Sequence, residues 1–207
     1  MKGLYAITPD LADTGELLRR AREALLGGVR LFQYRNKPAH AALRREQAAA
    51  LLRLCHDHDA QVIVNDDLNL ALAIGADGVH LGREDGDLAA ARAALGGNRI
   101  LGVSCYDDLE QARQARRSGA DYVAFGSFFA SLTKPHAVRP RQTLLTEAKS
   151  ELDLSICAIG GITLQNAPQL IAAGADLLAV VTDLFQAPDI RARATAYTSL
   201  FPKRVPS

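Results

Sequence analysis

Three polar side chains alternate along one short stretch of the chain, at Gln33, Arg35 and Lys37, just before Pro38. In an extended strand, side chains two residues apart point in the same direction, so these three would share one face. A carboxamide, a guanidinium and an ammonium group placed together can bind a compact anion such as phosphate or pyrophosphate. Taken alone, the stretch is equally compatible with a solvated strand end.

Aspartates follow the next two predicted strands, at Asp66 and at Asp85. Because neighbouring parallel strands end at the same edge of a sheet, the two carboxylates are expected to converge. Carboxylates completed by water and substrate phosphates are ligands that Mg²⁺ prefers, so both residues are candidate metal ligands. Alternatively, an aspartate at each place caps the following helix. Asp67 and Asp87 are also available as caps, which leaves one carboxylate free in each pair.

Other polar residues and glycines come at or after the ends of the remaining predicted strands. In parallel α/β proteins, ligands bind outside the carboxyl ends of the strands, so residues at these positions are candidates for one shared site. Chance explains any one of them, but it explains their collection at one end of almost every strand poorly. The candidate binding residues of this group are Asn65, His80, Ser104, Ser131, Thr133, Lys134, Gly160, Gly161, Val181 and Thr182.

Short apolar runs alternate with helical patterns along the whole chain, and this alternation would position the candidate residues. Unbroken strand–helix alternation, with strands apolar on both faces, predicts a parallel sheet covered by helices. Eight such units favour a single-domain (β/α)8 barrel over residues 1–207, with a doubly wound open sheet as the alternative. The predicted strands are Leu4–Thr8, Leu31–Arg35, Gln61–Asn65, Gly78–Leu81, Ile100–Ser104, Tyr122–Gly126, Ser155–Gly160 and Leu177–Val181.

Three entries into predicted strands share the tripeptide Gly-Ala-Asp, at 75–77, 119–121 and 174–176. A glycine at the end of a helix adopts the left-handed conformation readily, because it has no Cβ. We therefore interpret the repeat as a recurrent helix-to-strand turn and not as a binding site.

Several candidates have specific alternatives. The pairs 160–161 and 181–182 follow the last two strands, where barrels of this kind often bind phosphate through backbone N–H groups, although Gly-Gly is also a common turn. A lone histidine in a strand, such as His80, is usually a satisfied core residue, but Asp85 nearby favours a functional role. Lys134 is either a phosphate ligand or a solvated loop lysine.

The composition indicates an ordinary folded protein. The 207 residues are 48% hydrophobic and 23% charged with a formal net charge of +1, so nothing global points to nucleic acid or a membrane surface. No apolar run is long enough to span a bilayer, and residues 1–5 lack a signal-peptide profile. Cys55, Cys105 and Cys157 form no metal or disulfide pattern, so a reducing cytoplasm is the expected location. The sequence does not indicate an oligomeric state.

Taken together, these residues resemble the thiamine-phosphate synthase family over almost the whole chain. No single motif is decisive, but their order and spacing in one chain are highly specific. The matching stretches are Tyr5-Ala6-Ile7-Thr8, Gln33-x-Arg35-x-Lys37, Val64-Asn65-Asp66, Gly78-Val79-His80-Leu81-Gly82-x-x-Asp85, Gly102-Val103-Ser104, Asp121-Tyr122 with Gly126, Thr133-Lys134, Ile159-Gly160-Gly161-Ile162 and Ala179-Val180-Val181.

The resemblance implies a (β/α)8 barrel that joins two small phosphorylated heterocycles. One is 4-amino-2-methyl-5-hydroxymethylpyrimidine pyrophosphate and the other is 4-methyl-5-(2-phosphoethyl)thiazole, and the products are thiamine phosphate and pyrophosphate. In this family the pyrophosphate is thought to leave first, and the thiazole nitrogen then traps a pyrimidine carbocation.

The resemblance also implies roles for the candidate residues. A leaving pyrophosphate needs concentrated positive charge, part of which a Mg²⁺ ion on Asp66 and Asp85 would supply. Gln33 and Asn65 would add hydrogen bonds. The residues implied in catalysis are Arg35, Lys37, Lys134 and Ser104. The phosphate of the second substrate would lie near Ser131, Thr133, Gly161 and Thr182.

The chain departs from the family pattern at a few positions. The family usually has an acidic residue at the position of Asn36, and Asn36 is expected to face away from the site together with Tyr34. Asp183 would place a negative charge near a phosphate if it pointed inward. The remaining departures are Arg83 for Gln, Ala130 for Pro, Ser131 for Thr, and Thr182 for Ser, of which Ser131 and Thr182 keep a hydroxyl group.

Three other functions are compatible with parts of this pattern. A related thiazole tautomerase shares the barrel but would not need the pyrophosphate-binding residues. A Schiff-base aldolase would use Lys134 as its nucleophile, although a lysine in a loop is difficult to desolvate. A barrel that binds thiamine phosphate or its precursors without catalysis is the third alternative.

Overall fold

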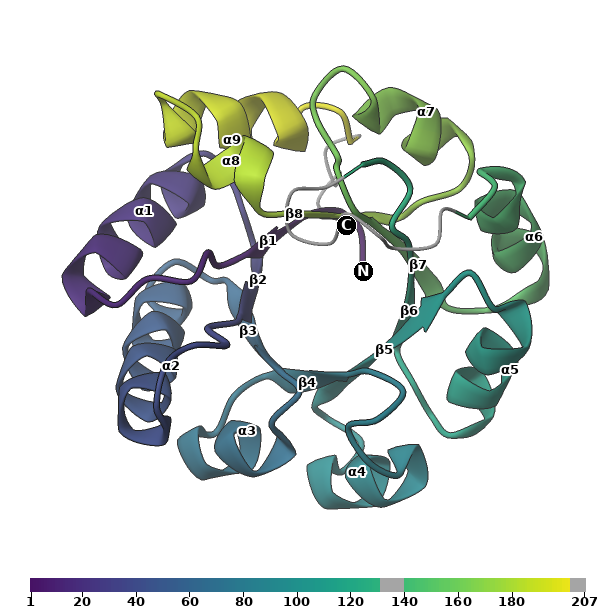
Figure 1. The fold of residues 1–207 in the computed structure, drawn as a ribbon, viewed down its shortest axis with the longest axis horizontal. Coiled ribbons are helices and arrows are strands. Elements are labelled where there is room, and N and C mark those ends of the chain that lie inside the picture. Colours follow the sequence, from purple (N-terminus) through teal and green to yellow (C-terminus); the bar gives the residue numbers. More distant parts are fainter. Residues whose placement is uncertain (131–139, 202–207) are drawn as a thin grey trace.

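Eight parallel strands close into one barrel in the order of the sequence (Figure 1). The strands are β1 (Gly3–Ile7), β2 (Leu31–Tyr34), β3 (Gln61–Asn65), β4 (Gly78–Leu81), β5 (Ile100–Tyr106), β6 (Tyr122–Phe125), β7 (Ser155–Ile159) and β8 (Leu177–Val180). β1 pairs with β8, so that Tyr5 lies opposite Ala179. This closure confirms the predicted (β/α)8 barrel and shows that the open-sheet alternative is wrong. The computed structural model describes residues 1–130 and 140–201.

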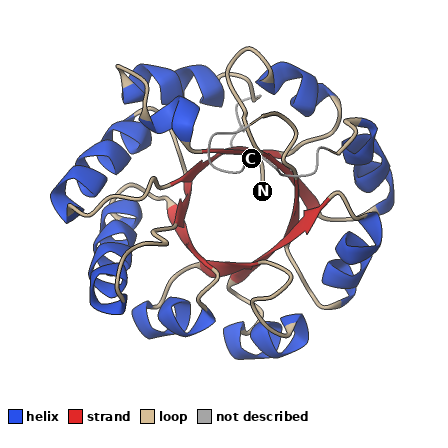
Figure 2. Ribbon diagram, in the orientation of Figure 1, coloured by secondary structure: helices blue, strands red, loops and turns tan. Residues whose placement is uncertain are grey.

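Helices surround the barrel on its outer side (Figure 2). They are α1 (Thr14–Leu26), α2 (Ala41–His56), α3 (Leu68–Ile74), α4 (Leu88–Leu95), α5 (Leu109–Arg117), α6 (Thr143–Glu151), α7 (Ala167–Ala172), α8 (Thr182–Phe185) and α9 (Ile190–Thr198). Several begin after an aspartate whose carboxylate accepts the N–H of the third helical residue, which satisfies an otherwise orphaned donor. These capping residues are Asp13, Asp67, Asp87, Asp108 and Asp189. Within the described ranges, no helix has the length and apolar composition needed to cross a membrane.

The barrel wall separates two apolar cores, because successive side chains of a strand point to opposite faces. Outward-facing residues such as Phe32 and Val62 belong to the core beneath the helices. The inner core contains two tyrosines, Tyr5 and Tyr122, among aliphatic side chains and Cys157. Cys157 and the other two cysteines are buried free thiols.

Each Gly-Ala-Asp turn ties two neighbouring strands together at the amino end of the barrel. The three glycines have φ of 71°, 83° and 113°, which confirms the predicted turn. In each turn, the aspartate accepts a backbone N–H from the preceding strand, and a buried N–H without an acceptor costs about 1–3 kcal/mol. The pairs are Asp77 Oδ2 with Val62 N at 2.7 Å, Asp121 Oδ2 with Leu101 N at 2.8 Å, and Asp176 Oδ2 with Ile156 N at 2.9 Å.

The strands β1, β2, β6, β7 and β8 end one residue earlier than predicted, and two elements differ more. β5 continues past Ser104 to Tyr106, with a shift in its pairing to β6 between these two residues. α8 was not expected, because a helix of four residues is too short to show a periodic pattern. Of the long loop predicted after β6, residues 131–139 lie outside the described ranges.

Candidate active site

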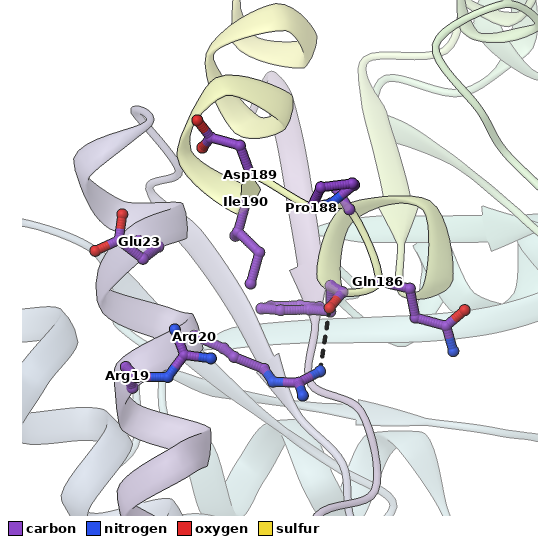
Figure 3. Close-up of a pocket in the computed structure, with 9 residues that line it drawn as sticks. Arg19, Arg20, Glu23, Gln186, Pro188, Asp189 and Ile190 are labelled. Atoms are coloured by element: carbon purple, nitrogen blue, oxygen red, sulfur yellow. Dashed lines mark hydrogen bonds between the residues drawn. The ribbon is translucent and has the colours of Figure 1, made fainter.

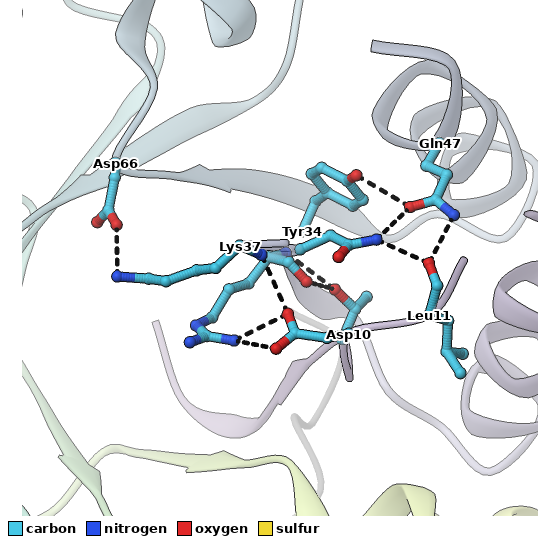
Figure 4. Close-up of polar contacts among 9 residues, drawn as sticks. Asp10, Leu11, Tyr34, Lys37, Gln47 and Asp66 are labelled. Atoms are coloured by element: carbon cyan, nitrogen blue, oxygen red, sulfur yellow. Dashed lines mark hydrogen bonds and ion pairs between the residues drawn. The ribbon is translucent and has the colours of Figure 1, made fainter. Parts of the chain in front are cut away.

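The residues after β2 lie at the carboxyl end of the barrel, which we call the barrel mouth, and they contact two aspartates (Figure 4). Arg35 Nη1 is 3.0 Å and 3.2 Å from the two carboxylate oxygens of Asp10, and the backbone N–H of Lys37 donates to the same carboxylate at 3.1 Å. The Lys37 ammonium is 3.3 Å from Asp66 Oδ2. Asp10 is absent from the predicted set, although its place just after the first strand is the same signal that identified the other candidates.

Asp66 and Asp85 come together beside Lys37. Asp66 has a φ of 62°, a left-handed conformation that is uncommon for residues other than glycine and that is concentrated at functional sites. Asp85 accepts the Gly82 N–H at 2.6 Å. Desolvation raises the pKa of the Asp85 carboxyl group, and Asp66 adds to this rise, whereas the Gly82 N–H and Lys37 lower it. Two like charges held this close favour a cation beside them.

The second aspartate of each predicted pair has a different role. Asp67 Oδ1 accepts the N–H of Leu70 at 2.8 Å, and Asp87 Oδ1 accepts the N–H of Ala90 at 2.7 Å. These two residues therefore cap α3 and α4. The capping alternative is correct for Asp67 and Asp87, and the carboxylates of the other two aspartates stay at the barrel mouth.

The chemistry of this group fits Mg²⁺. Among the described residues, the contacts above join the cations Arg35 and Lys37 to three carboxylates, those of Asp10, Asp66 and Asp85. This set is net negative, so a pyrophosphate would bind to it far better with an added cation. The described ranges contain no group of three or more His, Cys, Asp or Glu side chains that could hold a metal. Two carboxylates completed by water and phosphate oxygens are a common environment of Mg²⁺.

A chain of hydrogen bonds runs through the barrel interior from Gln33 to Ser104. Gln33 Nε2 donates to the hydroxyl of Tyr5 at 2.8 Å, and the hydroxyls of Tyr5 and Tyr122 are 2.8 Å apart. His80 Nδ1 is 2.8 Å from the Tyr122 hydroxyl, and His80 Nε2 is 2.8 Å from Ser104 Oγ. Burial raises the pKa of both tyrosines, so both keep their protons. His80 is therefore a buried, hydrogen-bonded core residue, and it also contacts the candidate residue Ser104.

The sequence prediction omits both tyrosines of this chain. A signal exists, because each tyrosine stands in a strand whose other residues are apolar, and a buried tyrosine hydroxyl usually has a polar partner. The partner itself could not be identified, since Tyr5 and Tyr122 are 117 positions apart.

Tyr34 faces Gln47 of α2, outside the barrel wall (Figure 4), and Asn36 contacts the same side chain, as expected. Both donate to Gln47 Oε1, Tyr34 at 3.0 Å and Asn36 Nδ2 at 2.9 Å. Asn36 Nδ2 also donates to the carbonyl of Leu11 at 2.7 Å. An amide suits this position because both contacts need a donor, which a carboxylate does not provide. The departure at position 36 therefore belongs to a structural network away from the barrel mouth.

Gly160 and Gly161 form a tight turn after β7, with φ of 101° and 61°. The loop that follows β6 lies directly against this turn. The Phe129 N–H donates to the Gly160 carbonyl at 3.1 Å, and a Cβ on Gly161 would overlap the carbonyl of Ala130. Asn166 Nδ2 donates to the Gly161 carbonyl at 3.0 Å. The two glycines therefore allow two loops to meet at the barrel mouth.

Asp183 points away from the barrel mouth. Its carboxylate accepts the hydroxyl proton of Tyr197 at 2.7 Å and pairs with Arg193 Nη1 at 2.7 Å, and both partners belong to α9. Its negative charge is therefore compensated on the outer side of the barrel. The conflict considered for an inward-pointing Asp183 does not arise in this structure.

The other predicted residues are distributed as follows. Asn65 ends β3 opposite His80, Val181 precedes α8, and Thr182 is the first residue of that helix. Ser131, Thr133 and Lys134 lie outside the described residues.

One cavity lies away from these residues, between α1 and the segment joining α8 to α9 (Figure 3). Its volume is about 710 Å³, but Arg20 on its wall already donates to the Phe185 carbonyl at 3.1 Å and pairs with Glu16 at 2.7 Å. A second cavity, of about 210 Å³, is lined by Arg35, Lys37 and Asp66, and also by Tyr34 and Asn36, which face α2. Arg35, Lys37 and Asp66 therefore border this second cavity, and Asp85 does not line it.

Comparison with known proteins gives a consistent result. The family model described as thiamine monophosphate synthase matches residues 4–184. The thiamine-phosphate synthase of Aromatoleum aromaticum is 57% identical over 201 residues, which are 97% of each chain. The structure of a thiamine phosphate pyrophosphorylase from Pyrococcus furiosus superposes with a TM-score of 0.84 at 32% identity, covering 96% of this chain and 94% of that one. A 3-hexulose-6-phosphate synthase from Salmonella typhimurium, 19% identical with a TM-score of 0.74 over 97% of this chain and 98% of that one, shares the fold.

Proposed function

The chain belongs to the thiamine monophosphate synthase family, and on this premise we propose that it condenses 4-amino-2-methyl-5-hydroxymethylpyrimidine pyrophosphate with 4-methyl-5-(2-phosphoethyl)thiazole. The products are thiamine phosphate and pyrophosphate. The observation that carries this proposal is the convergence of Lys37, Asp66 and Asp85 beside Arg35 at the barrel mouth. These groups suit a leaving group that carries several negative charges.

In the proposed reaction, the bond between the pyrimidine methylene carbon and the pyrophosphate oxygen breaks, and the pyrophosphate keeps the electron pair. The thiazole nitrogen then gives its lone pair to the methylene carbon and forms the new C–N bond. Arg35 and Lys37 hold the pyrophosphate and stabilise the charge that develops on it. Asp66 and Asp85 would hold a Mg²⁺ ion, which would supply further positive charge against the leaving pyrophosphate.

The remaining residues bind and orient the two heterocycles. Asn65 and Ser104 would form hydrogen bonds to the pyrimidine, whereas Gln33 is buried and its Nε2 already donates to the Tyr5 hydroxyl. The reaction needs no protein nucleophile and no strong general base, in contrast to a Schiff-base aldolase. His80 would act on the substrate through Ser104, to which its Nε2 is hydrogen bonded. The groups proposed to bind the phosphates of the substrates are Ser131, Thr133, Lys134, Gly160, Gly161, Val181 and Thr182.

Release of pyrophosphate tests the proposal directly. We expect release only when both heterocycles and Mg²⁺ are present. A protein that binds both heterocycles without releasing pyrophosphate would be a non-catalytic barrel, and one that isomerises a thiazole carboxylate would be a tautomerase. Borohydride trapping of a carbonyl substrate on the wild type but not on Lys134→Ala would identify an aldolase. Each of these results would contradict the proposal.

The metal site has a matched pair of variants, Asp85→Asn and Asp87→Asn. Both remove one charge from the same loop, but Asp87 caps α4 whereas Asp85 is a proposed ligand. We expect Asp85→Asn to weaken Mn²⁺ binding, measured by calorimetry as a substitute for Mg²⁺, by about tenfold or more, because one of two carboxylate ligands is lost. Asp87→Asn should bind Mn²⁺ as the wild type does. Equal affinities for all three proteins would remove Asp85 from the metal site.

A further inference from the structure

Tyr5 and Tyr122 occupy the middle of the interior hydrogen-bond chain and do not themselves reach the barrel mouth. Both are fully buried, and Gln33 and His80 are buried as well. Ser104, at the far end, is half-buried and is the member of the chain nearest to solvent. Any influence of the tyrosines on a substrate must therefore pass through His80 and Ser104.

The direction of each bond in this chain follows from the number of protons available. Gln33 Nε2 is a donor, so the Tyr5 oxygen accepts from it. The single proton of Tyr5 is then free to point at Tyr122, and in turn the single proton of Tyr122 points at His80 Nδ1. The reverse order would leave the Tyr5 proton without an acceptor among the described residues, which is costly in a dry interior.

We propose that Tyr5 and Tyr122 are positioning residues that hold His80 in the neutral form protonated on Nε2, so that Ser104 accepts from His80 and presents its own proton at the barrel mouth. The imidazole nitrogen that carries the proton is set by the bond that the other nitrogen makes. Since His80 Nε2 donates to Ser104 Oγ at 2.8 Å, the hydroxyl proton of Ser104 has to point elsewhere.

This arrangement defines what Ser104 recognises. With one lone pair used by His80, the hydroxyl group is a donor toward the mouth, and it fits an acceptor such as a ring nitrogen of an aminopyrimidine. This part of the inference rests on the proposed function. The protonation state of His80 does not, because it is a property of the free protein.

The state of His80 can be read from ¹⁵N chemical shifts of the free protein at neutral pH, with the signal assigned by a His80→Gln variant. We expect a protonated Nε2 and an unprotonated Nδ1 in the wild type. Tyr122→Phe removes the proton donor to Nδ1, so the form protonated on Nδ1 should become populated, and kcat/KM should fall about tenfold. A wild-type His80 that is protonated on Nδ1, or on both nitrogens, would overturn the proposal.

Tyr34→Phe is the matched control, because Tyr34 is equally buried but its hydroxyl bonds to Gln47 outside the barrel wall. It should leave the His80 signal and kcat/KM unchanged. If Tyr122→Phe also left the signal unchanged, or if Tyr34→Phe altered it to the same extent, the tyrosine chain would not set the state of His80. A correct ¹⁵N result in a protein that releases no pyrophosphate would refute the proposed function alone.

Discussion

Replacing Gly102 with alanine should destabilise the barrel far more than the addition of one methyl group suggests. Gly102 lies on β5 directly opposite Tyr122 on β6. A Cβ at this position would overlap the Tyr122 ring and its hydroxyl oxygen. The ring has no room to move, because it is fully buried and packs edge-on against Tyr5, with ring centroids 5.7 Å apart.

The size of the effect follows from two terms. Overpacking a filled interior costs about 1–3 kcal/mol. Displacing the Tyr122 hydroxyl also leaves at least one buried group, on Tyr5 or His80, without its hydrogen bond, which costs about 1–3 kcal/mol more. We therefore expect Gly102→Ala to lower the free energy of unfolding by about 2–6 kcal/mol, and to lower activity in the molecules that remain folded.

Urea unfolding followed by circular dichroism measures this change, and Gly97→Ala is the control. No atom lies within 4 Å of a Cβ added at Gly97, so the control should be neutral or slightly stabilising, by up to about 1 kcal/mol. A Gly102→Ala protein with wild-type stability and activity would refute the close packing of Gly102 on Tyr122, and with it the rigid placement of the interior chain.

Three further predictions concern the aspartates. Asp121→Ala removes the acceptor of the Leu101 N–H and should lower the free energy of unfolding by about 1–3 kcal/mol in urea titrations. Asp107→Ala, at an exposed position, should leave the free energy of unfolding unchanged. Equal effects of the two substitutions would contradict a stabilising role of the Asp121–Leu101 hydrogen bond. Asp183→Asn should lower the melting temperature, because Arg193 loses its ion pair. The same substitution should leave KM for the thiazole phosphate within about twofold of the wild type. A large fall in KM would mean that Asp183 faces the phosphate. Because folding raises the pKa of Asp85, ionisation of this group opposes folding, and the penalty grows as the pH rises through that pKa. In EDTA, the Asp85→Asn protein should therefore melt at a higher temperature than the wild type at neutral pH and at the same temperature in acid. A difference in melting temperature between the two proteins that does not change with pH would contradict this prediction.

The barrel and its mouth were predictable because both depend on patterns that are local in the sequence. Strand–helix alternation gave the fold, and the rule that sites lie after parallel strands gave Lys37, Asp66 and Asp85. The same rule did not decide which aspartate of each pair caps a helix, since both candidates stand within three residues of the helix start. That choice depends on the backbone angles of the turn, such as the left-handed φ of Asp66.

Features that depend on contacts between distant segments were not predictable in the same way. The direction of Asp183 is set by Tyr197 and Arg193, which α9 brings back against α8. The hydrogen bond between Tyr5 and Tyr122 spans the barrel interior and exists only after the barrel has closed. A single sequence contains no local periodicity that records such pairs.

The Gly-Ala-Asp turns have a consequence for how this protein can change over evolutionary time. They fix strand register with Asp77, Asp121 and Asp176 at the amino end of the barrel, whereas the proposed chemistry uses a different set of residues at the opposite end. The hydrogen bonds of these three aspartates therefore do not depend on which residues stand at the mouth. The residues that fix the strand register and the residues proposed for catalysis are therefore separate groups within one small chain.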